Sequence, residues 1–108
     1  MAVPTIDPHE VPFSQATISY RFRDGRTIDE LAVELRSGLV RPDDVPPIRV
    51  TERQGTLHTL DNRRLEVFRR ARVAVPYVLA SEADVAAEAW KFTTTDEGTS
   101  VRVRGRRT

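Results

Sequence analysis

The sequence predicts a small α+β domain built from a mixed sheet and three helices. Two kinds of local signal predict this class: segments with apolar residues at helical spacing follow helix-capping residues, and short β-branched segments lie between them. With 108 residues, the chain is long enough for one domain with a modest core. We expect residues 1–12 to form an extended lead-in, residues 13–105 the domain, and residues 106–108 a basic tail.

The first part of the chain is expected to contain a short strand, a helix and a loop. Residues 13–18 come close to a strand pattern, and an Asp-Gly turn follows at residues 24–25. Thr27 and Glu30 then have the spacing of a capping box, and Gly38 marks the end of the helix that they begin. Closely spaced prolines after this helix predict a loop.

The middle of the chain predicts a hairpin followed by a second helix. Residues 48–51 form an apolar strand pattern, and Gln54-Gly55 forms a turn into a second strand over residues 56–60. Apolar residues at helical spacing then predict a helix from about residue 62 to residue 71. The turn between this hairpin and this helix carries the strongest chemical signal in the chain.

The last part is expected to supply a strand, a third helix and a hairpin. Residues 73–79 are rich in β-branched residues, and Pro76 favours an edge position or a bend. The third helix has a capping signal at its start, and we expect Trp90 near its end and Phe92 after it to belong to the core; the alternative is that they are base-stacking surfaces. Residues 92–94 and 99–103 are expected to pair around an Asp-Glu-Gly turn.

Composition excludes several classes of function. The net charge of +1 excludes a polybasic arm, so any nucleic-acid contact must come from a local patch. The absence of cysteine excludes thiol catalysis, disulfides and cysteine-ligated metals. No apolar run approaches membrane-spanning length and the start of the chain lacks a signal-peptide pattern, so we expect a soluble protein with no membrane partner.

The sequence Asp61-Asn62-Arg63-Arg64 predicts an anion site at the start of the second helix. The backbone N–H groups of a first helical turn are unpaired and the helix dipole is positive there, so such a turn attracts anions. Two arginines add forked donors that match phosphate oxygens. The alternative is that both arginines bridge to nearby carboxylates and have only a structural role.

Three residues are candidates for catalysis and two more for ligand contact. Asp61 could bind Mg²⁺ or activate water, and its alternative role is the helix cap. His58 could move a proton, as histidines in reactive sites commonly do, although its side-chain direction on the strand is open. Asp24 is a second carboxylate candidate, or only a turn former. Ser14 and Gln15 could reach a ligand or could satisfy loop backbone groups. No residue pattern predicts a protein-bound metal site.

The order of these parts resembles the ParB N-terminal domain, whose superfamily includes sulfiredoxin. The resemblance spans roughly residues 13–80, and it depends on the following segments: the helix at residues 28–32, Pro47-Ile48-Arg49-Val50, the Asp61–Arg64 turn, and Val75-Pro76-Tyr77-Val78. A closer variant covers nearly the whole chain. With Phe13-Ser14-Gln15, residues 60–65 and residues 98–105, the chain is similar to ParB-like domains at the C-termini of bacterial polymorphic toxins.

The resemblance implies a function but not a complete mechanism. Arg63 and Arg64 correspond to arginines that contact phosphate, and Asn62 could cap the helix or orient a phosphate oxygen. Asn62 also occupies the position of the ParB glutamate and of the sulfiredoxin cysteine, so neither of those chemistries transfers. We expect an enzyme that acts on nucleic acid or a nucleotide, such as a nuclease, a nucleotide hydrolase or a phosphotransferase. The alternative is a non-enzymatic nucleotide- or DNA-binding module.

Cofactors and partners follow from the same resemblance. Mg²⁺ and a nucleoside triphosphate are the expected cofactors, and a nucleotide or nucleic acid is the expected partner. As a toxin domain the protein would be delivered from the cell and would have an immunity protein as a partner; otherwise it would be cytoplasmic. The sequence leaves the oligomeric state open.

Overall fold

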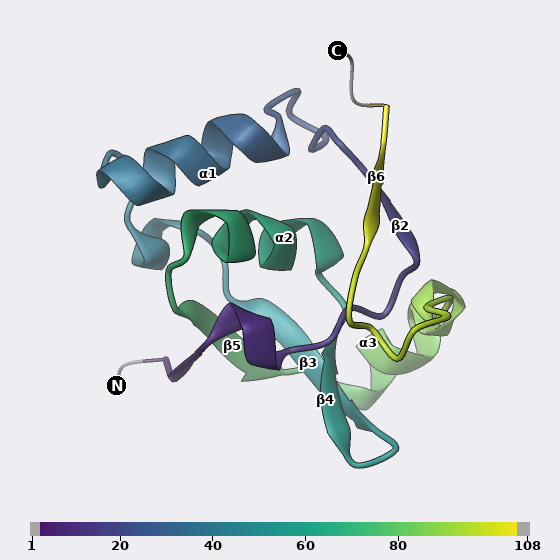
Figure 1. The fold of residues 1–108 in the computed structure, drawn as a ribbon. Coiled ribbons are helices and arrows are strands. Elements are labelled where there is room, and N and C mark those ends of the chain that lie inside the picture. The colour runs from purple at the N-terminus through teal and green to yellow at the C-terminus, as the bar shows by residue number, and fades with distance from the viewer. Residues whose placement is uncertain (1–2, 106–108) are drawn as a thin grey trace.

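The computed structural model describes residues 3–105 and has the expected α+β class, with three α-helices and two sheets (Figure 1). The basic tail predicted at residues 106–108 lies outside the described residues. In chain order the elements are β1 (Thr5–Ile6), η1 (Pro8–Glu10), β2 (Thr17–Ser19), α1 (Ile28–Ser37), η2 (Pro42–Asp44), β3 (Ile48–Arg53), β4 (Thr56–Thr59), α2 (Asn62–Ala71), β5 (Val75–Leu79), α3 (Glu82–Ala87), η3 (Ala89–Lys91) and β6 (Arg102–Arg104), where η denotes a 3₁₀ turn.

The main sheet has four strands in the order β1-β5-β3-β4. Its centre is the parallel pair β3–β5, and both outer pairs are antiparallel. α2 belongs to the connection from β4 to β5, and it lies between the sheet and α1 (Figure 1). The second sheet consists of β2 and β6 alone, which run parallel.

The capping signals of α1 are confirmed. The Thr27 side chain accepts the N–H of Glu30 at 3.1 Å, and the Glu30 carboxylate accepts the N–H of Thr27 at 3.0 Å. Gly38 ends the helix in the left-handed conformation, with φ of 83°, and its N–H donates to the carbonyl of Leu35. Each end of α1 is therefore determined by residues within one turn of it.

The hairpin β3–β4 is confirmed as well. Gln54 and Gly55 both have positive φ, at 55° and 82°, which is the pattern of a two-residue turn whose twist matches the flanking strands. Arg53 pairs with Thr56 across the turn, and the ladder continues to the pair Val50–Thr59. The hairpin thereby brings the end of β4 and the start of α2 next to Arg49 in β3.

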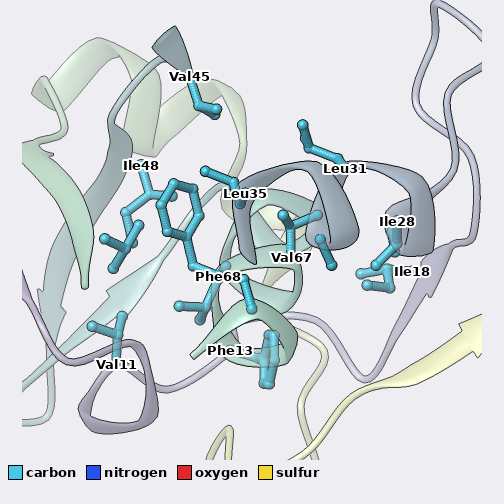
Figure 2. Packing of buried hydrophobic residues seen from close by; sticks show 14 of the residues in the cluster. Val11, Phe13, Ile18, Ile28, Leu31, Leu35, Val45, Ile48, Val67 and Phe68 are labelled. Carbon is cyan, nitrogen blue, oxygen red and sulfur yellow. The ribbon is translucent and has the colours of Figure 1, made fainter. Parts of the chain in front are cut away.

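The core lies between the two long helices and between α2 and the sheet (Figure 2). Because α2 is covered on two sides, it buries apolar residues on more than one face, and Val67 and Phe68 are both fully buried. Burying side chains of this size stabilises the fold by about 1.5–3 kcal/mol each. The main contributors shown in Figure 2 are Val11, Phe13, Ile18, Ile28, Leu31, Leu35, Val45, Ile48, Val67 and Phe68.

The two ends of the chain differ from the expectation. The lead-in contains β1, which pairs with β5, and the turn η1, and its Val11 is buried. Since β1 flanks β5, the expected edge position of Pro76 is wrong; a hydrogen bond from Tyr77 N–H to the carbonyl of Pro4 joins the two segments without needing a donor from Pro76. The C-terminal hairpin is also wrong, because β6 pairs with the distant β2.

The third helix begins as expected, with the Ser81 side chain accepting the N–H of Asp84 at 3.0 Å. It ends at Ala87, and residues Ala89–Lys91 form a separate 3₁₀ turn. Trp90 in that turn is 66% exposed, so its expected place in the core is wrong. Within residues 3–105, no helix is both long and apolar enough to cross a membrane.

Candidate functional site

A cleft of about 820 Å³ lies at the start of α2, and we refer to it as the α2 cleft. Cationic side chains outnumber acidic ones in its wall, which also includes aromatic and small polar residues. The lining residues are Gln15, Ile18, Ser19, Phe22, Arg23, Asp24, Arg49, Leu60, Asp61, Asn62, Arg63, Arg64, Glu88, Trp90, Lys91 and Arg104. The predicted Asp61–Arg64 turn therefore borders a cleft whose walls carry more cationic than acidic side chains.

Asp61 is tied to Arg49. One carboxylate oxygen accepts the backbone N–H of Arg49 at 2.7 Å and its Nε–H at 3.0 Å, and the other accepts from Nη2 at 2.8 Å. The same second oxygen lies 2.8 Å from Nη2 of Arg64. Both oxygens of Asp61 are thus occupied by arginine donors in a side chain that is only 7% exposed.

These contacts set the ionisation of the carboxyl. Burial would raise the pKa of Asp61, but the hydrogen bond from Arg49 and the charge of Arg64 outweigh burial and hold the pKa below its ordinary value. The hydrogen bonds to Asp61 and then to Glu88 raise the pKa of Arg49. A carboxylate that is stabilised in its charged form is a weak proton acceptor, so Asp61 is suited to positioning arginines rather than to general-base chemistry.

The side chain of Asp61 consequently does not cap α2. It occupies the N-cap position, but it accepts no hydrogen bond from the first turn of the helix. An aspartate in this position ordinarily binds the N–H of the second or third helical residue. Because its carboxylate is turned toward Arg49, the first turn of α2, whose residues Asn62, Arg63 and Arg64 line the cleft, has no side-chain cap.

Arg63 and Arg64 both line the cleft, and both have protein partners. Arg63 donates from Nη1 to the carbonyl of Arg21 at 2.7 Å, and its guanidinium lies 5.5 Å from the ring centre of Phe22. Arg64 donates from Nη1 to the carbonyl of Pro46 at 2.9 Å and pairs with Asp61. The structural alternative therefore applies to Arg64, whereas no carboxylate is paired with Arg63 among residues 3–105.

Asn62, Ser14 and Gln15, which we predicted as ligand contacts, bind one another. The Asn62 side-chain oxygen accepts the N–H of Ser14 at 2.9 Å and of Gln15 at 3.2 Å, and its Nδ2 donates to Ser14 Oγ at 2.9 Å and to Gln15 Oε1 at 3.1 Å. Ser14 is fully buried and does not line the cleft, so a ligand cannot reach it directly. The Asn62 side chain therefore holds residues 14–15 against the start of α2.

His58 does not share the cleft with Asp61. It is 8% exposed and lines a second cleft of about 590 Å³, together with Arg53 and Phe92. Its Nδ1 lies 3.2 Å from the carbonyl of Thr56. His58, in β4, pairs with Thr51, which is two residues closer to the hairpin turn than Arg49 is. The structure thus separates His58 from the carboxylate that it was predicted to assist.

Asp24 does line the α2 cleft. One of its oxygens accepts the N–H of Arg26 at 3.0 Å, which is the bond expected of a turn former. The turn role and a place in the cleft are therefore compatible. Among the histidine, aspartate and glutamate residues of the described part of the chain, no three come together as a metal site.

Sequence reasoning missed several residues of the cleft wall, among them the four charged residues described next and Trp90, which it assigned to the core. Arg49 stands between apolar residues in a strand, and that position was the one available signal. Glu88 lies 2.6 Å from Nη1 of Arg49, and Lys91 lies 2.5 Å from Glu88. Arg104 reaches the cleft because β6 pairs with β2. These contributions depend on contacts between distant segments, which spacing along the chain does not reveal.

Comparisons with models of known protein families, with curated proteins and with solved structures found no match. The resemblance to ParB-like domains therefore stays a prediction.

Proposed function

We propose that the α2 cleft binds the phosphate group of a nucleotide or of a nucleic acid. The observation that carries this proposal is the turned-away carboxylate of Asp61, which leaves the first turn of α2 without a side-chain cap inside a largely cationic cleft. An anion there would accept backbone N–H groups and interact favourably with the helix dipole. Arginine guanidiniums nearby would add charge-assisted hydrogen bonds.

Within this proposal the arginines have different tasks. Arg63 contacts the ligand, because its one hydrogen bond to the Arg21 carbonyl leaves further guanidinium donors for phosphate oxygens. Arg49 fixes Asp61, and Asp61 in turn orients Arg64. In the free protein the carboxylate of Asp61 neutralises part of the charge of Arg49 and Arg64. Both guanidiniums are therefore held in place before a ligand binds.

Among free nucleotides, a nucleoside triphosphate brings more negative charge to such a cleft than a mono- or diphosphate does. If Mg²⁺ accompanies it, Asp61 does not fit the ion, because both carboxylate oxygens already accept arginine donors. Asp24 is the carboxylate of the cleft that accepts only one described hydrogen bond, so it is the better candidate for an oxygen ligand. The metal would then be bound chiefly by the phosphates.

Phosphoester hydrolysis is the second candidate function, and the position of Asp24 in the cleft favours it. As a base, its carboxylate would accept a proton from the attacking water as the new P–O bond forms and the bond from phosphorus to the leaving oxygen breaks, while Arg63 stabilises the charge that develops on phosphate oxygens. Binding without turnover is better supported, because the arginines occupy Asp61 and the sheet places His58 elsewhere.

Thermal unfolding with added ligand tests the binding proposal. ATP with and without Mg²⁺, inorganic tripolyphosphate and a single-stranded oligonucleotide serve as probes. A ligand present at about 100 times its Kd stabilises the protein by about 2.7 kcal/mol, which raises the Tm by roughly 10 °C in a domain of this size. Arg63→Ala should abolish the shift, and the exposed Arg102→Ala, which removes the same charge outside the cleft, should preserve it.

Two further measurements separate the candidate functions. The affinity of a nucleic acid should fall steeply with salt, because each neutralised phosphate releases counterions, whereas a mononucleotide should show a weaker dependence. Phosphate release from ATP and cleavage of the oligonucleotide report turnover, which Asp24→Asn should abolish if the hydrolytic function is correct. The absence of a thermal shift with every probe would contradict the binding proposal itself.

A further inference from the structure

An exposed tryptophan forms part of the α2 cleft. Trp90 is 66% exposed and lines the same space as Arg63 and Lys91. Single apolar side chains on a protein surface are common and need no function. Trp90 differs from them because its ring borders a charged cleft, where water has to be excluded before a ligand can bind.

The backbone beneath this ring is fastened to the sheet. Lys91 donates from Nζ to the carbonyl of Leu60 at 2.8 Å and lies 2.5 Å from Glu88. Glu88 in turn lies 2.6 Å from Nη1 of Arg49. Glu88 and Lys91, which precede and follow Trp90 in the chain, are therefore connected to Arg49, the arginine that holds Asp61. The backbone that carries Trp90 is therefore held by its neighbours, so a ligand would have to order only the side chain.

The other aromatic side chain of the cleft is already used. The guanidinium of Arg63 lies 5.5 Å from the ring centre of Phe22, and Phe22 is only partly exposed. Lys91 Nζ lies 5.7 Å from the ring centre of Trp90, but its hydrogen bond to Leu60 holds that amine toward the sheet. Trp90 is consequently the aromatic surface of this cleft that is open to a planar ligand.

We propose that Trp90 is the stacking surface for the base of a phosphate-bearing ligand, so that the cleft selects nucleotides over simple phosphates. This inference rests on the proposed function, since it places the phosphate at the start of α2 and the base on η3. Stacking tolerates every base, because each has a π face, but it requires that the base be unpaired. The ligand is therefore a free nucleotide or a single strand, and not a duplex.

Trp90 is the only tryptophan of the chain, so its fluorescence reports this contact directly. The titrants are ATP, oligo(dT), the same oligo(dT) paired with oligo(dA), and inorganic tripolyphosphate. We expect ATP or single-stranded oligo(dT) to quench the emission, and whichever quenches identifies the source of the base. Tripolyphosphate should raise the Tm without quenching, and the duplex should quench less than the single strand.

Variants test whether the ring contributes to affinity. Trp90→Ala should weaken binding of the quenching ligand by about tenfold or more, the size of effect expected from loss of one base–aromatic stack. It should leave the affinity for tripolyphosphate unchanged. Trp90→Phe should retain most of the affinity, and Leu39→Ala, which truncates a 76% exposed side chain outside the cleft, should change neither affinity.

The outcomes separate this inference from the function on which it rests. Equal affinity for ATP and tripolyphosphate, with unchanged emission and no effect of Trp90→Ala, would overturn the stacking inference and leave the phosphate site intact. Quenching that is unchanged by Arg63→Ala would place the ligand away from the start of α2 and would also overturn it. If no probe binds by thermal shift or by fluorescence, the proposed function and the stacking inference both fail.

Discussion

Removing the Asn62 side chain should destabilise the fold, because this one residue holds residues 14–15 against the start of α2. In Asn62→Ala, the N–H groups of Ser14 and Gln15 lose their acceptor at 2.9 and 3.2 Å. A buried donor left without a partner costs about 1–3 kcal/mol. Ser14 is fully buried, while water can reach the half-buried Gln15, so we expect a total loss of about 2–4 kcal/mol.

Urea and thermal unfolding followed by far-UV circular dichroism measure this loss. The expected decrease in Tm is about 10–20 °C for a domain of this size. The matched control is Gln15→Ala, which keeps the backbone N–H of residue 15 and removes one of the two oxygens that accept from Asn62 Nδ2, so it should cost about 1 kcal/mol or less. If Asn62→Ala costs no more than this control, Asn62 does not clamp residues 14–15, and its assignment as a ligand contact would have to be reconsidered.

Two further predictions concern a buried charge and a crowded turn. In Asp61→Asn the free energy of unfolding at neutral pH should fall by about 2–4 kcal/mol, because Arg49 loses its buried partner. The folded-state pKa of Asp61 lies below the ordinary 3.8, so its stabilisation is complete above about pH 4 and is lost as the pH falls through the lower value. Urea unfolding from pH 2 to pH 7 should therefore show a flatter acid limb for the variant; an identical limb would contradict the assignment. Gly98→Ala should cost more than 1 kcal/mol in urea unfolding, because a Cβ would lie 2.4 Å from the carbonyl of Phe13 at a φ of 79°; an unchanged midpoint would show that residues 12–13 can move away.

The parts of the fold that sequence reasoning predicted are those whose determinants are local. The capping pair Thr27 and Glu30 and the terminating Gly38 lie within or next to α1, and all three act as their spacing predicts. The same is true of the Gln54-Gly55 turn, whose positive φ angles fix the β3–β4 register. Such signals need no knowledge of the rest of the chain.

The parts that were wrong depend on distant partners. β6 pairs with β2 instead of forming a hairpin with residues 92–94, and nothing in the alternation of residues 99–103 distinguishes a near partner from a far one. The cap of α2 failed for a related reason. Asp61 occupies the predicted N-cap position, but its carboxylate binds Arg49 in β3. Spacing along the chain does not show that Arg49 lies close enough to compete with the helix for this carboxylate.

The candidate site was predicted in location more than in composition. The turn before α2 does border a cleft, and Arg63, Arg64 and Asp24 do line it. Ser14 was assigned to the ligand because it is polar in an apolar segment, yet its polarity serves a buried hydrogen-bond pair. Trp90 was assigned to the core because apolar spacing alone does not show which side of a short turn faces solvent.

The parallel pairing of β2 with β6 also has a consequence for the order in which the protein becomes complete during synthesis. Arg104 forms part of the cleft wall through this pairing, and Tyr20 donates its N–H to the carbonyl of Arg104 at 2.9 Å. A chain emerging from the ribosome exposes α1, α2 and the main sheet well before residues 102–104. In the described part of the chain the buried apolar residues run from Val11 to Val75, so the residues of the core are made before this strand. The α2 cleft is therefore complete only once residues 102–104 have paired with β2, and the binding that we propose for it would require the chain through Arg104.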